Sequence, residues 1–325
     1  MKFGNRHIFD LFAFLSVAVT CADSLRSDRS NTKDREEQEG NPSLLKPNVN
    51  LIKSQRKLER CHDNDIYHIH MSETKNHLLE FLKGEKDENP TLLWIGCSLD
   101  RYQIVSVCSL LGGKIDRIFP DGATGDRPAA IACSSPHINL GYLQIFGMHQ
   151  RCNGEAADAV DPRKFNNEAD HIRTLLPELL EKMVSTPTHV QIGSNLWDLS
   201  PGCNNNLGVA ESFQKLYVQG MHEVYEAVYE ILPSSTQISW RTGMPVHTAY
   251  SNTAKGRKLE NQEVLNRLVE QEVQSSLQEM GSFLDHWSVV RKAPTDCCMM
   301  QDGRHYPPCS SYAFFNNWLD GIYSS

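Results

Sequence analysis

The stretch LLWIGCSLDRY, residues 92–102, changes at Ser98 from a continuous apolar run to a sequence with helical spacing. This change is typical of the end of a buried strand and the start of a helix in an α/β protein. Ligands of such proteins bind at the carboxyl ends of the parallel strands, where helix N-termini favour negative charge. The pattern therefore predicts Ser98 to be a nucleophile, with an ordinary N-cap as the alternative.

Apolar runs and amphipathic segments alternate along the rest of the chain. The runs predict strands at residues 91–95, 114–119, 138–146, 189–192, 238–241 and 287–290. Helical spacing predicts helices at residues 99–111, 169–184 with a break at Pro177, 209–232, 260–280 and 312–319. Alternation of this kind indicates an α/β fold with a mostly parallel sheet covered on both faces. Polar residues that follow the strands should therefore meet at one edge of the sheet.

The N-terminal part has the layout of a secretory signal peptide over residues 1–22. Basic residues precede an apolar stretch at 8–19, which is shorter than the roughly 20 residues of a membrane span. An uncleaved signal anchor is the alternative. Residues 23–60 are polar and charged and predict a flexible stem, and residues 61–325 predict one domain. We expect a secreted protein or one in the lumen of the Golgi or ER.

Composition bears on partners and on redox state. A formal net charge of −8 without a long basic run disfavours nucleic acid as a partner. Ten cysteines, one of them Cys21 in the leader, fit an oxidising compartment with disulfides. The odd number that remains leaves at least one thiol free or paired between chains. Residues 61–70 contain histidines and a cysteine without a recognised zinc spacing, which favours a structural strand with a disulfide cysteine.

Asp302 and His305 complete a candidate catalytic set with Ser98. Acyl transfer by a serine needs a base, a group that orients the base, and donors for the oxyanion. The Asp-X-X-His spacing places a carboxylate behind an imidazole on one loop. We interpret His305 as the base and Asp302 as its orienter. A surface histidine and a turn-forming aspartate are the alternatives.

Three groups are candidates for the oxyanion hole: the Ser98 N–H, the Gly125 N–H and the Asn195 side-chain amide. Asn195 follows a predicted strand within a Gly-X-Asn sequence, and we expect its amide to point into the same cleft. For both Gly125 and Asn195 a plain turn role is the alternative. Arg241 and His247 are candidate substrate-binding residues, with a buried structural ion pair as the alternative.

At these residues the chain resembles the SGNH/GDSL hydrolase superfamily. It looks more closely like the PC-esterase branch, which includes the plant trichome-birefringence-like polysaccharide O-acetyltransferases. Ser98 with Arg101 resembles the opening Gly-Asp-Ser motif of that branch and its arginine three residues on. The closing Asp-X-X-His of the branch is matched by residues 302–305, and its Arg-Thr-X-X-Pro-X-His element by residues 240–247. The Gly-X-Asn block of the superfamily is matched by residues 192–198, and its second glycine-bearing block by residues 122–126.

The resemblance covers residues 91–320 and implies a three-layer α/β/α sandwich with a serine–histidine–aspartate site, no metal and no cofactor. Cys97 stands where the branch usually has aspartate. It is open to three interpretations: a disulfide partner, a buried apolar filler or a thiolate. Because the preceding strand is apolar throughout, we expect Cys97 to be reduced, buried and not the nucleophile.

The sequence therefore predicts a serine-dependent carbohydrate esterase or polysaccharide O-acetyltransferase that works through an acyl-enzyme. Its expected partner is an acylated carbohydrate or other ester, in the secretory pathway or outside the cell. The alternative is a catalytically silent glycan-binding protein that keeps the same cleft, which the departure at Cys97 supports.

Overall fold

The computed structural model describes residues 90–150, 154–200, 208–246, 257–276, 281–291, 304–306 and 308–323. Outside the described residues lie the expected leader and stem, the segment 61–70, Asp302 and His247. Within the described part of the chain, no helix is both long and apolar enough to cross a membrane.

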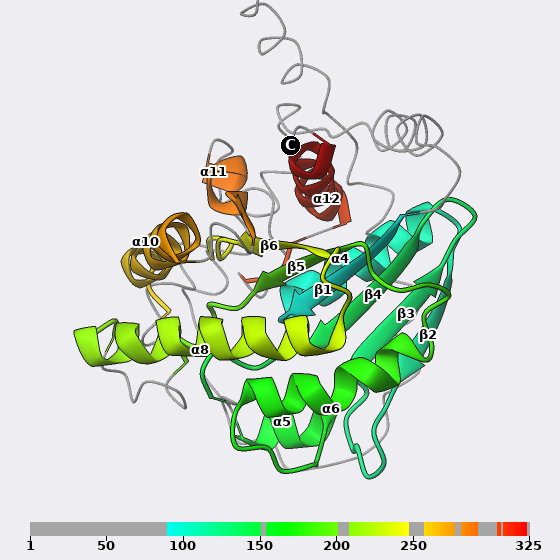
Figure 1. Ribbon diagram of the computed structural model, residues 1–325, viewed down its shortest axis with the longest axis horizontal. Helices are drawn as coiled ribbons and strands as arrows, with labels where there is room; N and C mark the ends of the chain where they lie inside the picture. Colours follow the sequence, from blue (N-terminus) through cyan, green and yellow to red (C-terminus); the bar gives the residue numbers. More distant parts are fainter. Residues whose placement is uncertain are drawn as a thin grey trace, which may run out of the picture.

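A seven-stranded sheet in the order β2-β3-β4-β1-β5-β6-β7 forms the centre of the molecule (Figure 1). The strands from β4 to β7 in this order run parallel, and β3 is antiparallel to both of its neighbours. The predicted mostly parallel sheet is thus confirmed. The strands are β1 (Thr91–Gly96), β2 (Lys114–Ile118), β3 (Ala130–Ser134), β4 (Asn139–Gln144), β5 (His189–Gly193), β6 (Gln237–Arg241) and β7 (Ser282–Leu284).

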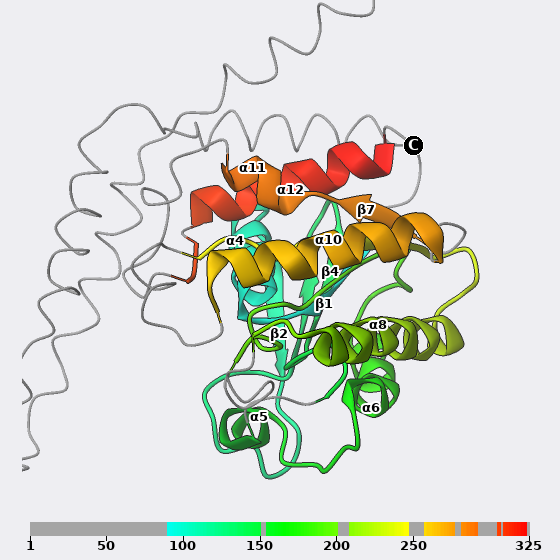
Figure 2. The same cartoon turned by 90° about the vertical axis from the view of Figure 1, so that its left-hand side faces the viewer.

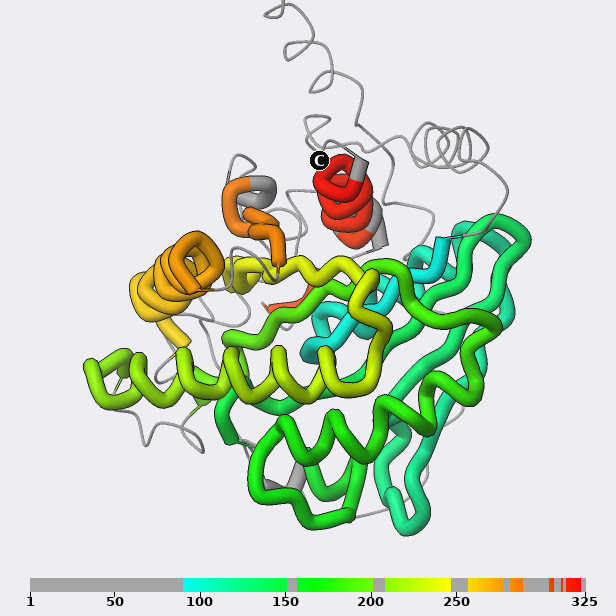
Figure 3. The backbone as a smooth tube through the Cα atoms, in the orientation of Figure 1, coloured from blue at the N-terminus to red at the C-terminus, as the bar shows by residue number. Residues whose placement is uncertain are grey.

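Helices cover both faces of this sheet. Figure 2 shows α8 and α6 on one side of the strands and α12 on the other, and the tube in Figure 3 shows the same separation of the green and red helices. The α/β fold expected from the sequence is therefore present. The described helices are α4 (Ser98–Leu110), α5 (Gly154–Val160), α6 (Glu168–Leu180), α8 (Glu211–Ile231), α10 (Leu259–Ser275), α11 (His286–Arg291) and α12 (Pro308–Tyr323).

The central strand β1 is buried along its whole length because it packs against helices on both faces. Successive side chains of a strand point to opposite sides of the sheet. Leu93 and Ile95 belong to the core formed with α6, α8 and α10, whereas Leu92 and Trp94 pack with α4 and α12. The Trp94 ring lies edge-on to Trp318 of α12, with ring centroids 4.7 Å apart. This packing holds α4 against the sheet and so fixes the position of Ser98, the first residue of the helix.

Some predicted elements differ from the structure. The expected strand at 287–290 is wrong, because these residues lie in helix α11 and the strand β7 comes just before them. Pro177 lies inside α6 without breaking it, since this position is exposed and the hydrogen bond that proline cannot make faces water. Strand β3 and helix α5 have no counterpart among the predicted elements.

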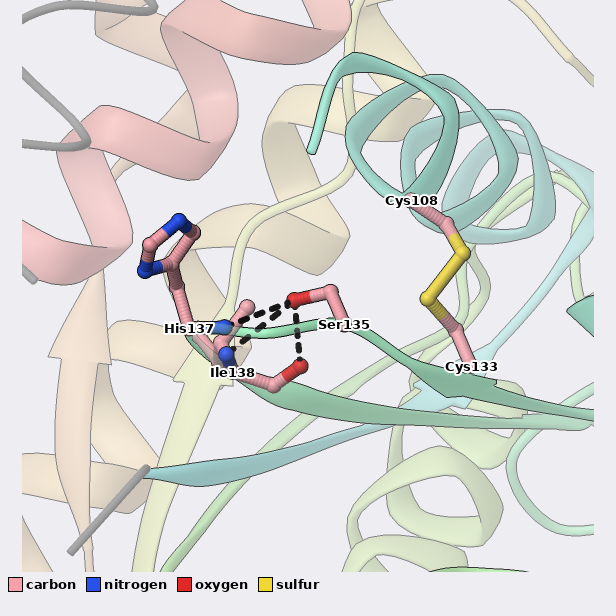
Figure 4. Close-up of a disulfide and its surroundings, with 5 residues drawn as sticks. All are labelled: Cys108, Cys133, Ser135, His137 and Ile138. Carbon is pink, nitrogen blue, oxygen red and sulfur yellow. Dashed lines mark hydrogen bonds between the residues drawn. A yellow bond between two sulfur atoms is a disulfide. The ribbon is translucent and has the colours of Figure 1, made fainter. Parts of the chain in front are cut away.

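A disulfide between Cys108 in α4 and Cys133 in β3 links helix α4 covalently to the sheet (Figure 4). This confirms the expectation of disulfide bonding. The two cysteines are 25 residues apart, and closing a loop of that size stabilises the fold by roughly 3 kcal/mol in the chain-entropy account. A Cβ at Gly113 would lie 2.8 Å from both sulfur atoms, so this close approach requires glycine. The bond restrains the helix that begins at Ser98.

Candidate active site

Ser98 and His305 lie in direct contact, although 207 residues separate them in the chain. Ser98 is the first residue of α4, directly after β1 and Cys97. Its Oγ lies 2.7 Å from Nε2 of His305, within the range needed for proton transfer. His305 is 8 % exposed and precedes α12, which packs on α4. The packing of these two helices therefore brings together the residues predicted as nucleophile and base.

Tyr102 positions the imidazole of His305. The ring centroids of Tyr102 and His305 are 4.8 Å apart. The guanidinium carbon of Arg101 lies over the Tyr102 ring, 5.5 Å from its centroid. Tyr102 is four residues after Ser98 and so lies on the same face of α4. One helix thus carries both the hydroxyl and an aromatic wall for its partner. Tyr102 was not among the predicted site residues, although its i+4 spacing from Ser98 places the two on the same helix face.

Asp100 and Arg241 form a buried ion pair at the start of α4. Arg241 ends β6 and donates from Nε to Asp100 Oδ1 at 2.7 Å, from Nη2 to Asp100 Oδ2, and to the Gly193 carbonyl at 3.2 Å. Asp100 Oδ2 also accepts the Cys97 N–H at 2.9 Å. Both side chains of the pair are 1 % exposed. The charge of Arg241 therefore faces Asp100, in the structural ion pair that was the alternative interpretation, and a substrate-binding role for Arg241 stays a prediction.

Gly96 and Gly193 make room for this ion pair. They lie opposite each other in the register of β1 and β5. A Cβ at Gly96 would lie 2.1 Å from Asp100 Oδ2, and one at Gly193 would lie 2.5 Å from Arg241 Cγ. A side chain at either position would displace the pair and with it the first turn of α4.

Cys97 is a buried, free thiol, as expected. Burial and the neighbouring Asp100 carboxylate raise its pKa to about 11, against the opposing effect of Arg241. Nucleophilic attack by cysteine needs the thiolate, which is scarce at neutral pH for a thiol with this pKa. Ser98 therefore remains the better candidate nucleophile of the two neighbours.

The side chain of Asn195 is buried and hydrogen-bonded to helix α10. It is 2 % exposed, and its Nδ2 donates to Asn266 Oδ1 of α10 at 2.9 Å. The orientation of the Asn266 amide is fixed because its Oδ1 accepts the Gly243 N–H at 2.7 Å and its Nδ2 donates to the Gly243 carbonyl at 3.3 Å. The Asn195 backbone has a φ of 145°, a value rare outside glycine. Asn195 is thus part of a buried amide network in which its Nδ2 has a second N–H, and its role as an oxyanion donor stays a prediction.

Gly125 is also engaged elsewhere. Its N–H donates to the Ala159 carbonyl at 2.9 Å, and the Thr124 N–H donates to the same oxygen at 3.1 Å. A Cβ at Gly125 would lie 3.1 Å from that oxygen, so glycine serves the close approach of this loop to α5. The third predicted oxyanion donor is the Ser98 N–H. It belongs to the first turn of α4, where amides have no acceptor within the helix.

A small cleft adjoins Ser98 and His305. Arg257 holds one wall of it: Nε donates to the Leu196 carbonyl at 2.8 Å, and the guanidinium carbon lies 5.3 Å from the centroid of the Trp197 ring. The predicted site residues do not include Leu196, Trp197, Arg257 or Arg304. Trp197 and Arg304 at least fall inside the motifs quoted above, whereas nothing in the sequence marked Arg257. The described lining residues are Cys97, Ser98, Leu196, Trp197, Arg257, Arg304 and His305.

The loop that carries Trp197 is anchored by the buried Asp198. Its carboxylate accepts the Ser194 hydroxyl at 2.5 Å and the Met148 N–H at 2.6 Å. Burial raises the pKa of Asp198 to about 6, against both hydrogen bonds, which lower it. The wall of the cleft therefore depends on a carboxyl group that titrates within the physiological range.

Fold and site together define an α/β protein with a serine–histidine pair at the carboxyl end of its central strand. No protein-family model and no curated protein matches the chain. Solved structures resemble it weakly. An aryl esterase from M. smegmatis is 12% identical, with a TM-score of 0.43 over 72% of this chain and 99% of that one.

Two carbohydrate esterases are similar to this chain to about the same extent as the aryl esterase. A carbohydrate acetylesterase family member from Sinorhizobium meliloti is 15% identical, with a TM-score of 0.42 over 72% of this chain and 97% of that one. A catalytic mutant of an acetylxylan esterase from Geobacillus stearothermophilus is 12% identical, with a TM-score of 0.40 over 73% and 96% of the two chains. Similarity this weak carries no conclusion about the chemistry of this chain. Membership of the PC-esterase branch stays a prediction.

Proposed function

We propose that this protein is a serine-dependent carbohydrate esterase or polysaccharide O-acetyltransferase. The observation that carries the proposal is the 2.7 Å contact between Ser98 Oγ and His305 Nε2 at the N-terminus of α4, on the wall of a small cleft. A serine hydroxyl becomes a useful nucleophile when an imidazole takes its proton. The signal-peptide-like leader and the Cys108–Cys133 disulfide support action in the secretory pathway or outside the cell.

The proposed reaction has two steps. Ser98 Oγ attacks the ester carbonyl carbon as its proton passes to His305 Nε2, and the Ser98 N–H with the α4 dipole stabilises the oxyanion. The bond from carbon to the sugar oxygen then breaks, and that oxygen takes the proton from His305. Water or a sugar hydroxyl then attacks the carbonyl carbon of the acyl-serine as its proton passes to His305 Nε2. The bond from that carbon to Ser98 Oγ breaks, Ser98 Oγ takes the proton from His305, and the free acid or a new ester leaves. Asp302 retains its proposed role as the group that orients His305.

A catalytically silent glycan-binding protein is the second candidate. It is favoured by the engagement of two predicted oxyanion donors elsewhere, the Gly125 N–H with Ala159 and the Asn195 amide with Asn266. A cleft left with one backbone donor would stabilise an oxyanion less well, because losing one donor costs about 2.7–4 kcal/mol of transition-state stabilisation.

Turnover of acetylated oligosaccharides tests the proposal. Purified wild type, Ser98→Ala and His305→Gln would be incubated with acetylated xylo-oligosaccharides, with and without an unacetylated acceptor. Wild type should release acetate or transfer it to the acceptor, and both variants should lose at least about a thousandfold in rate. Acetate release identifies the hydrolase, and acetylated acceptor identifies the transferase. Saccharide binding by wild type without turnover would favour the silent protein.

A further inference from the structure

The peptide unit between Cys97 and Ser98 lies at the start of helix α4. A trans peptide unit is planar, so its carbonyl oxygen and its N–H point in opposite directions and turn together. The Cys97 carbonyl accepts the Asp100 N–H at 3.0 Å and the Arg101 N–H at 3.2 Å, and it therefore points into the helix. The Ser98 N–H points away from the helix, and none of the described residues accepts a hydrogen bond from it.

A third donor reaches the same carbonyl oxygen from the sheet. The hydroxyl of Tyr142 in β4 donates to the Cys97 carbonyl at 3.0 Å, although the two residues are 45 positions apart. The Tyr142 side chain is fully buried in the core between the sheet and α4. Burial holds the pKa of Tyr142 well above its ordinary value of 10, so the hydroxyl keeps its proton at neutral pH. This hydrogen bond fixes the carbonyl relative to the sheet as well as to its own helix.

The Tyr142 hydroxyl also contacts Oε1 of Gln144, which is two residues further along β4. The Gln144 amide is held in place because its Nε2 donates to the Ile145 carbonyl at 3.1 Å. A tyrosine hydroxyl has one hydrogen, which here lies between two acceptor oxygens. Removal of the hydroxyl therefore affects the Cys97–Ser98 peptide unit only if the Cys97 carbonyl receives that hydrogen.

The orientation of this peptide unit matters because the Ser98 N–H is a proposed donor to the oxyanion. Such a donor is most effective when it is aimed at the position of the oxyanion before the reaction begins. A hydrogen bond to the carbonyl of a peptide unit also polarises that unit, which strengthens its N–H as a donor. A donor to the Cys97 carbonyl can therefore act on both the direction and the strength of the Ser98 N–H.

Both backbone polar groups of Cys97 are held by buried side chains. Asp100 accepts its N–H at 2.9 Å, and Tyr142 donates to its carbonyl. We propose that Tyr142 is a positioning residue for acyl transfer, which orients the Cys97–Ser98 peptide unit so that the Ser98 N–H faces the oxyanion. This inference rests on the proposed function, because it assigns a further residue to the same reaction.

Hydrolysis of 4-nitrophenyl acetate by Tyr142→Phe tests the inference, because this variant loses the hydroxyl and keeps the ring. Both steps of the reaction pass through an oxyanion, so kcat should fall by about tenfold or more while KM stays within about threefold. Tyr225→Phe provides the matched control, since Tyr225 is a buried tyrosine of α8 that stacks on Tyr229. It should leave kcat unchanged. An unchanged kcat in Tyr142→Phe, or an equal loss in Tyr225→Phe, would overturn the inference.

NMR tests the hydrogen bond itself and requires no activity. In protein labelled with carbon-13 at the cysteine carbonyl and nitrogen-15 on serine, only Cys–Ser peptide units give a carbonyl-to-amide signal. The chain has four such units, which begin at Cys97, Cys108, Cys133 and Cys309. The signal that disappears in Ser98→Ala is that of Cys97–Ser98. Tyr142→Phe should shift this signal, and the retained Cys108–Ser109 signal would show that the variant is folded. An unshifted Cys97–Ser98 signal would overturn the inference.

These measurements separate failure of the inference from failure of the proposed function. Wild type that is active on the ester, with Tyr142→Phe equally active, would contradict the role of Tyr142 alone. Wild type without activity on this ester or on acetylated oligosaccharides would contradict the proposed function, and the positioning role would fail with it. A shifted Cys97–Ser98 signal together with a selective fall in kcat would support the inference.

Discussion

Arg241 binds both carboxylate oxygens of Asp100 at the start of the helix that carries Ser98. The same carboxylate accepts the Cys97 N–H, so the ion pair fixes the backbone directly before the serine. This contact joins the end of β6 to the first turn of α4. A buried ion pair of this kind is strongly destabilising to break, because it leaves an uncompensated charge in the interior.

We expect Asp100→Asn to lower the free energy of unfolding by about 3–5 kcal/mol, since Arg241 would then be a buried charge without its carboxylate. The double variant Asp100→Leu with Arg241→Met should lose less than the sum of the two single variants. Urea unfolding followed by circular dichroism measures these values. A loss below about 1 kcal/mol in Asp100→Asn would show that the pair does not hold this region.

Asn195→Ala should affect stability rather than chemistry. The substitution removes the hydrogen bond to Asn266 and places alanine at a φ of 145°, so we expect a loss of about 1–3 kcal/mol in the free energy of unfolding. The kcat for a model acetyl ester should change by less than about tenfold at a temperature where the variant is folded. A fall of a hundredfold or more would return Asn195 to the oxyanion hole.

Asp198 predicts a pH dependence of stability. Its folded-state pKa of about 6 lies above its ordinary value of 3.8 because the group is buried. Between these values the folded protein holds a proton that the unfolded chain has lost, so stability falls as pH rises through this window. Relative to Asp198→Asn, wild type should lose up to about 3 kcal/mol between pH 4 and pH 7. Urea unfolding across that range would contradict the assignment if the difference stayed constant.

Tyr102 should act through His305. Tyr102→Ala removes the ring that packs 4.8 Å from the imidazole, and we expect kcat to fall by about tenfold or more with little change in KM. Tyr102→Phe keeps the ring and should retain most of the rate. The pH profile of kcat/KM should shift in the alanine variant and not in the phenylalanine variant. Equal losses in both variants would place the effect in the hydroxyl group instead.

Much of the fold was predictable from local sequence pattern. The apolar run before Ser98 indicated β1, and the helical spacing after it indicated α4, because burial on both faces of β1 leaves a continuous apolar signature. The error at residues 287–290 has a plain cause: four apolar-rich residues fit a strand and a helical turn equally well. Strand β3 is five residues long and flanked by polar turns, so it gave little periodicity to detect.

The candidate site was predictable where its residues belong to short sequence motifs. Ser98 and His305 were identified from short motifs, and the packing of α12 on α4 brings them together. The hydrogen bonds of Gly125 and Asn195 were not predictable, because their partners, Ala159 and Asn266, are distant in sequence. Arg257 was missed for the same reason, since its position in the cleft depends on the Leu196 carbonyl.

Labelling with a fluorophosphonate followed by peptide mass spectrometry tests the central claim most directly, because it reports which atom becomes acylated. Wild type should carry one adduct on Ser98. Labelling should vanish in Ser98→Ala, fall strongly in His305→Gln, and persist in Cys97→Ala, which serves as the control for the neighbouring thiol. An adduct on another residue, or undiminished labelling of Ser98→Ala, would contradict the assignment of Ser98 as the nucleophile.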